Sequence, residues 1–90
     1  MKNHWEREAA GILKSLLVRD GVSYKKLETE LAKLGIDEKE RTLTNKINLG
    51  TFSFPFFLSC LTALGYEDIR FTVRPPKLRS EGGRETPRIF

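Results

Sequence analysis

The stretch from Gly21-Val22-Ser23-Tyr24 to Asn45-Lys46-Ile47-Asn48-Leu49-Gly50 holds two short segments with apolar residues at helical spacing, separated by Gly35. A similar segment precedes this stretch, and another follows it and ends at Gly65. Glycine is favoured just past a helix C-terminus because the chain there adopts a left-handed conformation that a side chain would penalise. Glycines spaced about every fifteen residues therefore predict an all-α bundle of four or five short helices.

The two N-terminal helices are defined by their apolar faces. The first helix has one face running from Trp5 to Leu17, and we expect Trp5 to close one end of the core. Ser23 can cap the second helix, because its hydroxyl can accept an early backbone N–H. The apolar stripe of that helix is Tyr24, Leu27, Leu31 and Leu34.

The third helix is predicted over about Glu38 to Leu49, with Asp37 as its N-cap and Glu40 reaching back in a capping box. Its apolar face is thin and consists mainly of Leu43 and Ile47. The opposite side therefore presents polar residues, namely Arg41, Thr42, Asn45 and Asn48, with Thr44 and Lys46 on the flanks. Ser53 caps a fourth helix with Pro55 in its first turn.

Three regions follow from this reading: a helical domain over 1–68, a short strand over 69–76, and a flexible basic tail over 77–90. The alternation of Ile69, Phe71 and Val73 with polar residues predicts the strand, and Pro75 ends it. A lone strand needs a partner, so these residues are candidates for contact with a second copy of the chain. Phe52 and Phe56 fit the fourth helix face poorly and are further interface candidates.

Charge is unevenly distributed along the chain. The 90 residues carry a net charge of +4, yet residues 70–90 alone hold six basic and two acidic residues. The segment 37–50 has three of each. This distribution predicts a basic arm that contacts phosphates, whose candidates include Arg70, Arg74, Lys77 and Arg79.

The residues that usually carry catalysis or bind metals are scarce. One cysteine, Cys60, and one histidine, His4, cannot form an ordinary zinc site, and Cys60 fits a buried apolar position. No phosphate-binding glycine loop or paired-carboxylate site is evident. We therefore expect a protein that is not an enzyme, binds no cofactor or metal, has no membrane segment and is located in the cytoplasm.

Residues 8–66 resemble the Cro and λ-repressor-like family of helix-turn-helix DNA-binding domains. The matching positions begin with Gly21-Val22-Ser23-Tyr24 and continue through Leu27, Leu31, Gly35-Ile36, Leu43, Ile47, Gly50, Phe57, Leu61 and Ala63-Leu64-Gly65. Two departures are visible: Glu28 stands where that family usually has a small Ala, and the segment from Ser23 to Gly50 is longer. The chain is also similar to a small bacterial family of domains of unknown function.

The resemblance implies sequence-specific binding of duplex DNA, with a role in transcription in a bacterium, phage or mobile element, by a homodimer. It places Arg41, Thr42, Asn45 and Asn48 toward base edges, where Arg suits guanine and Asn suits adenine. It places Ser23, Tyr24, Lys25 and Lys26 toward phosphates, with Thr44 and Lys46 beside them.

Two other functions are compatible with the sequence. Glu38 and Glu40 lie close to the predicted DNA surface and would repel phosphate, which favours a protein-interaction adaptor that docks a partner through Phe52, Phe56 and the 69–73 strand. The aromatic cluster between Phe52 and Phe57 also allows single-stranded nucleic-acid binding by base stacking.

Overall fold

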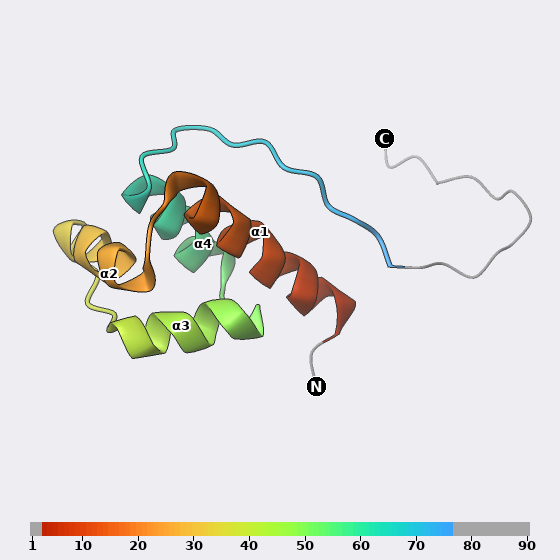
Figure 1. Cartoon of the computed structure of the whole chain (residues 1–90), viewed down its shortest axis with the longest axis horizontal. Coiled ribbons are helices and arrows are strands. Elements are labelled where there is room, and N and C mark those ends of the chain that lie inside the picture. The colour runs from red at the N-terminus through yellow and green to blue at the C-terminus, as the bar shows by residue number, and fades with distance from the viewer. Residues whose placement is uncertain (1–2, 77–90) are drawn as a thin grey trace, which may run out of the picture.

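Four helices and the loops between them make up residues 3–76, the part of the chain that the computed structural model describes. The helices are α1 (His4–Asp20), α2 (Tyr24–Lys33), α3 (Glu40–Leu49) and α4 (Phe54–Ala63). Figure 1 shows them in one cluster, from which the chain after α4 runs back along α1. The all-α prediction is confirmed, with four helices in residues 3–76.

The predicted helix starts are confirmed at two positions. The Ser23 hydroxyl accepts the backbone N–H of Lys26 at 3.1 Å, and the Ser53 hydroxyl accepts that of Phe56 at 3.1 Å. Pro55 lies in the first turn of α4, where its missing N–H costs no helical hydrogen bond. At the start of α1, Asn3 and Glu6 form a reciprocal capping box.

Three helices end with the same hydrogen-bonded turn. The backbone N–H of Val22, Ile36 and Tyr66 donates to the carbonyl of Leu17, Leu31 and Leu61, respectively, at 2.8–3.0 Å. Each donor follows a glycine with positive φ and packs its side chain against the core. The pairing of a glycine with an apolar residue is therefore the stop signal in this sequence, as in the Schellman motif.

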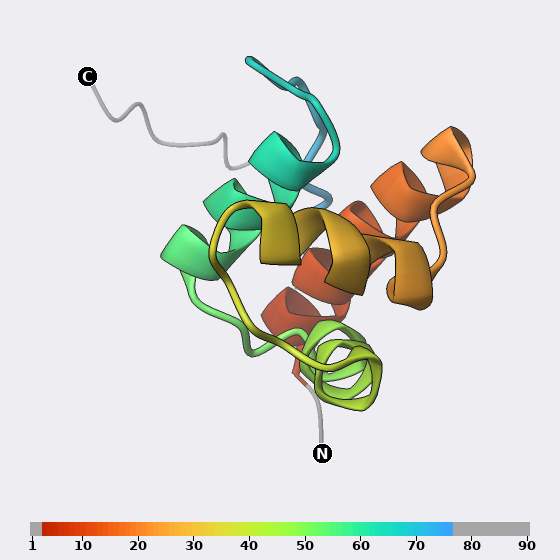
Figure 2. The same ribbon diagram turned by 90° about the vertical axis from the view of Figure 1, so that its left-hand side faces the viewer.

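The core is formed where the helices cross. Its fully buried members are Leu13, Leu27, Leu31, Leu43, Ile47 and Cys60. Helix α3 packs against α1 and α2, and α2 also packs against α4. In Figure 2, α3 is viewed along its axis while α2 passes across it. The thin apolar face of α3 is thus enough to hold the helix, because two other helices close over it.

Gly50 is required by two features at once. Its φ of 72° lies in the left-handed region, and a Cβ there would collide with the backbone carbonyl of Glu6. The end of α3 therefore touches the first turns of α1 backbone to backbone. No other residue type fits at this crossing without moving a helix.

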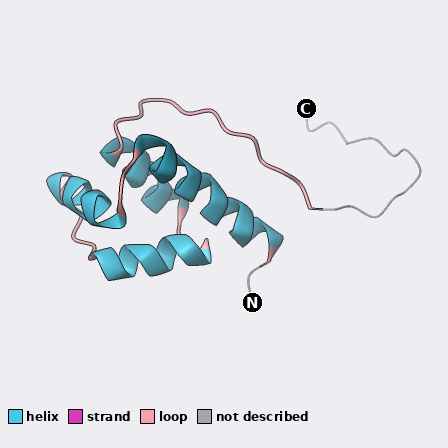
Figure 3. Cartoon of the chain, viewed as in Figure 1, coloured by secondary structure: helices cyan, strands magenta, loops and turns pink. Residues whose placement is uncertain are grey.

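Three expectations are wrong. Residues 69–76 form no strand, and no strand occurs elsewhere in residues 3–76, as Figure 3 shows. The segment is held against α1 by side chains and has no strand partner. Helix α3 begins at Glu40 after Lys39, so Asp37 is not its N-cap. Trp5 is 54% exposed, because the core face of α1 passes through Ala10, Leu13 and Leu17.

Candidate nucleic-acid interface

The outward side of α3 carries three of the four proposed base-contact residues. Arg41, Thr42 and Asn45 are exposed, whereas Leu43 and Ile47 on the same helix are fully buried. Within residues 3–76 the side chains of these three residues take part in no hydrogen bond or ion pair. Asn48 is half-buried and has an interaction of its own, so it lies at the edge of this surface.

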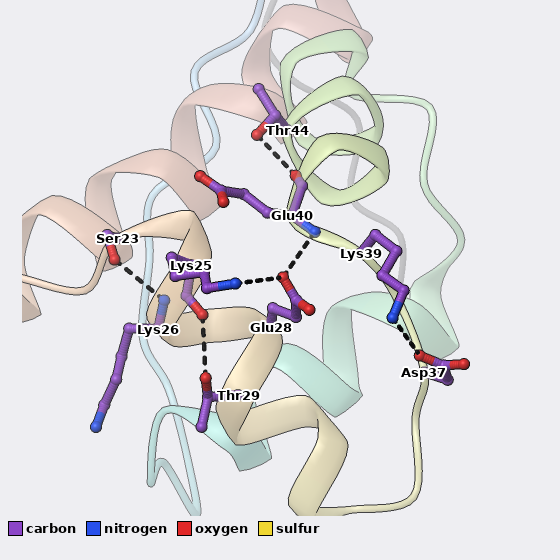
Figure 4. Close-up of polar contacts among 9 residues, drawn as sticks. All are labelled: Ser23, Lys25, Lys26, Glu28, Thr29, Asp37, Lys39, Glu40 and Thr44. Carbon is purple, nitrogen blue, oxygen red and sulfur yellow. Dashed lines mark hydrogen bonds and ion pairs between the residues drawn. The ribbon is translucent and has the colours of Figure 1, made fainter.

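A carboxylate from α2 caps the start of α3. Glu28 Oε1 accepts the backbone N–H of Glu40 at 3.0 Å and lies 3.8 Å from Lys25 Nζ (Figure 4). Lys39, the residue before the helix, makes no side-chain capping bond, so the anionic acceptor at the positive end of the α3 dipole comes from another helix. The cap joins α2 to α3 at the N-terminal end of the exposed α3 face.

Sequence reasoning missed the role of Glu28. The available signal was the unusual Glu in place of a small residue where α2 approaches its neighbour. Its side chain is only 23% exposed, although it belongs to a short polar helix. A partly buried carboxylate needs donors, and Lys25 together with the free end of α3 supplies them.

The lysines proposed to contact phosphate already have acidic neighbours. Lys26 lies 3.3 Å from Glu30, and Lys33, which was not a phosphate candidate, lies 3.2 Å from the same carboxylate. The two lysines lower the pKa of the Glu30 carboxyl, with Lys33 as the larger cause. Lys46 Nζ lies 2.8 Å from Glu38 and 4.8 Å from the ring centroid of Phe56. The surface of α2 and α3 is therefore nearly neutral as it stands.

The remaining α2 and α3 candidates have structural partners. Ser23 caps α2, and the Thr44 hydroxyl donates to the Glu40 carbonyl at 2.9 Å. Tyr24 packs against the core, and burial raises the pKa of its hydroxyl. The side chains of Lys25 and Lys26 are 71% and 59% exposed, against 40% for Lys46.

Arg70 and Arg74 are not beside α3. The residues of α1 that border the 70–74 segment include Glu8, Ile12 and Ser15, which lie on the side opposite Ala10, Leu13 and Leu17. Figures 1 and 2 agree that α1 lies between α3 and this segment. The two groups of proposed DNA contacts therefore occupy different sides of the domain. Lys77 and Arg79 lie outside the described residues, as does the rest of the 77–90 tail.

Arg74 is fastened to α1 at three points. Its backbone N–H donates to Glu8 Oε2 at 2.8 Å, its guanidinium lies 3.4 Å from Glu8 Oε1, and its carbonyl is 2.7 Å from His4 Nε2. The N–H of Arg74 is the main reason that the pKa of the Glu8 carboxyl is lowered. These contacts hold the segment along α1 without any β pairing.

The interface candidates divide between core and surface. Phe52, Phe56 and Ile69 are half-buried against the core, whereas Phe71 and Val73 are 46% and 51% exposed. The Phe71 ring meets Phe57 edge-on, with centroids 6.1 Å apart. An apolar pocket of about 260 Å³ opens here, lined by Ala9, Ile12, Phe52, Ser53, Phe54, Phe57 and Phe71. Phe54, which is 67% exposed, was not predicted to face solvent.

The described residues hold no metal-binding cluster, and their one cysteine is buried. No group of three His, Cys, Asp or Glu side chains in residues 3–76 is placed to hold a metal ion. Burial raises the pKa of the Cys60 thiol to about 12, which keeps it protonated at neutral pH. Over the same residues, no helix combines the length and apolar character needed to cross a bilayer.

The chain belongs to the family described as domain of unknown function DUF6471, whose sequence profile matches residues 5–69. This range takes in α1 to α4 almost completely and stops before Arg70. Comparisons with curated proteins and with solved structures give no match.

Proposed function

We propose that this protein binds duplex DNA in a sequence-specific manner, with α2 and α3 as a helix-turn-helix unit of the λ-repressor-like type. The observation that carries the proposal is the outward face of α3. Arg41, Thr42 and Asn45 share that face, and their side chains are engaged by nothing else in residues 3–76. A guanidinium, a hydroxyl and an amide on one exposed helix face are the groups that pair with base edges in a major groove.

Helix α2 would lie along the phosphates in this arrangement. Ion pairs between exposed side chains contribute little, so Lys25 and Lys26 can exchange their glutamate partners for phosphate oxygens at small cost. The connection between the helices, residues 34–39, is longer than the usual three- or four-residue turn. The Glu28 cap supports the proposal because it holds α3 to α2 across this longer connection.

The proposal includes a homodimer in transcriptional control, located in the cytoplasm, and no enzymatic activity. One short helix reads only a few base pairs, so a specific site calls for two copies of α3 in successive turns of the groove.

The test is selection of bound sequences from a random duplex pool, followed by titration of the selected duplex against Asn45→Ala and Arg41→Gln. Loss of one base contact should reduce discrimination at one position by about 1–3 kcal/mol and leave non-specific binding nearly unchanged for Asn45→Ala. Arg70→Gln is the matched control, because Arg70 lies on the far side of α1. Equal losses on every sequence for Asn45→Ala would remove α3 as the reading helix.

The apolar pocket favours a second candidate function, a protein-interaction adaptor. Exposed Phe54 beside Phe52 and Phe71 offers an anchor surface for an apolar side chain of a partner. Phe54→Ser separates the two functions: it should leave duplex binding intact if α3 reads DNA, and it should abolish partner binding if the pocket is the working surface.

A further inference from the structure

A second groove, distinct from the apolar pocket, runs between α1 and residues 70–74. It has a volume of about 400 Å³, within the size range of small-ligand sites. On α1 its lining follows one stripe from Glu8 through Gly11 and Ser15 to Arg19. These positions span about three turns, or roughly 16 Å of helix.

Three arginines border this groove. Arg19, Arg70 and Arg74 contribute three positive charges to the lining and Glu8 contributes one negative charge, which leaves a net charge of +2. The Glu8 carboxylate is already bound by the N–H and guanidinium of Arg74, so its charge is locally compensated. Arg70 is exposed and has no partner within residues 3–76.

Arg19 is positioned at the other end of the groove. Its guanidinium donates to the Tyr66 hydroxyl at 2.7 Å, and that hydroxyl in turn donates to Asp20 Oδ1 at 3.2 Å. Only one nitrogen is used in the bond to Tyr66, so the remaining N–H groups of Arg19 stay available as donors. The groove therefore has an arginine with a fixed partner at each end: Arg19 is bonded to Tyr66, and Arg74 is bonded to Glu8.

The wall opposite α1 offers neutral donors as well. Residues 70–73 are not helical, and their backbone groups make no hydrogen bond within residues 3–76. The Thr72 hydroxyl is likewise unengaged there. On the α1 side of the groove, Gly11 has no side chain, and a Cβ added to it would meet nothing within 4 Å.

We propose that the groove between α1 and residues 70–74 is a binding site for a nucleotide-sized organic phosphate. Guanidinium groups and free backbone N–H groups together are the donors that phosphoryl oxygens select. Phe71, which is 46% exposed, borders the same groove and presents a ring for a planar base. The site is independent of the α3 face and does not require that the protein bind duplex DNA.

A nuclear magnetic resonance titration of the full chain tests this site. Adenosine monophosphate should shift the amide signals of Gly11, Ser15 and Thr72 in a saturable way, and adenosine without its phosphate should not. Arg70→Gln should weaken this binding at least tenfold. Arg41→Gln, the matched control on α3, should leave it unchanged.

A second variant blocks the groove by charge without touching an arginine. Gly11→Glu introduces a carboxylate where space is open, so the helix is retained while the phosphate is repelled. Binding by this variant should be lost, with an unchanged circular dichroism spectrum as the check on folding.

The source of the phosphoryl group is decided by one further probe, a 5′-phosphorylated dinucleotide. Arg70-dependent binding of the dinucleotide but not of adenosine monophosphate would assign the site to a nucleic-acid strand end. Binding of adenosine monophosphate or of the dinucleotide that ignores both Arg70→Gln and Gly11→Glu, or no binding of either phosphate, would overturn the inference.

Discussion

Glu28 on α2 caps α3 by accepting the backbone N–H of Glu40 at 3.0 Å. A helix cap is usually supplied by the residue just before the helix, and here that residue is Lys39, whose side chain makes no capping bond. The Glu28 carboxylate therefore satisfies a backbone N–H at the start of α3 and, by the same hydrogen bond, links α3 to α2.

Replacement of Glu28 by Ala should lower the free energy of unfolding by about 1 kcal/mol, the usual contribution of a cap. Glu30→Ala is the control, because Glu30 lies on the same helix and has only ion-pair partners. Chemical denaturation of both variants checks the difference.

Lys39→Asp in the Glu28→Ala background should restore the loss. Lys39 already has the extended backbone of an N-cap, with φ −78° and ψ 153°, so an Asp there can accept the backbone N–H of Arg41 or Thr42 and supply α3 with an ordinary cap. A double variant no more stable than Glu28→Ala would show that α3 gains no stability from an acceptor at its N-terminus.

Three glycines should respond differently to Ala. Gly50→Ala meets both a left-handed φ and the Glu6 backbone, and should cost at least about 3 kcal/mol. Gly65→Ala has the left-handed φ but open space, and should cost about 1–2 kcal/mol. Gly11→Ala in the middle of α1 should stabilise by about 0.5–1 kcal/mol. Thermal denaturation gives the order, and equal costs at Gly50 and Gly65 would contradict the close helix crossing.

The Glu8 contacts should hold the segment around Arg74 only while the carboxyl is ionised. The folded pKa of Glu8 is lowered, so its contribution is present above the ordinary value of 4.5 and is lost as pH falls through the lower folded value. Hydrogen exchange at the Arg74 amide should therefore speed up, relative to the intrinsic rate, in acid and in Glu8→Ala at neutral pH. Glu67→Ala, an exposed carboxylate, is the control and should leave the exchange unchanged.

Because burial raises the pKa of the Cys60 thiol, we expect the protein to lose stability at high pH. Its thiol has an ordinary pKa of 9.0 and a folded pKa of about 12, so above pH 9 the unfolded chain binds fewer protons than the folded chain. Stability from this group is complete below pH 9 and should fall as pH rises toward 12. Denaturation midpoints of the parent chain and of Cys60→Ala are measured at pH 8 and at pH 10.5. Because lysines titrate in both proteins, the difference between their declines gives the contribution of the Cys60 thiol. A parent chain with the same decline as Cys60→Ala would contradict it.

Truncation after Pro76 should weaken binding to all duplex sequences alike and reduce the slope of affinity against salt. The removed residues include Lys77, Arg79, Arg84 and Arg88, which the proposed function expects to contact phosphates without reading bases. The cut leaves the Arg74 contacts with Glu8 and His4 in place. A change in binding can therefore be assigned to the removed residues and not to loss of these contacts. Fluorescence anisotropy across a salt series measures both quantities.

The local signals in the sequence were sufficient for three of the four helices. Ser23, Ser53 and the glycines followed by Val22, Ile36 and Tyr66 mark starts and stops that need only neighbours in the chain. The same local logic failed at Asp37, because it assigned the α3 cap to the nearest acceptor when the acceptor comes from α2. It failed again at residues 69–76, where alternation predicts a strand but Glu8 and His4 hold the chain instead.

The sequence by itself determined the elements that depend on neighbouring residues, namely the helices, their glycine stops, the burial of Leu43 and Ile47, and the polar outward face of α3. Only the tertiary structure decided that Trp5 faces solvent, that Arg70 and Arg74 lie across α1 from α3, and that Glu28 completes another helix. The physical reason is range: caps and apolar periodicity act within a few residues along the chain, whereas these three placements depend on which helix faces meet in space.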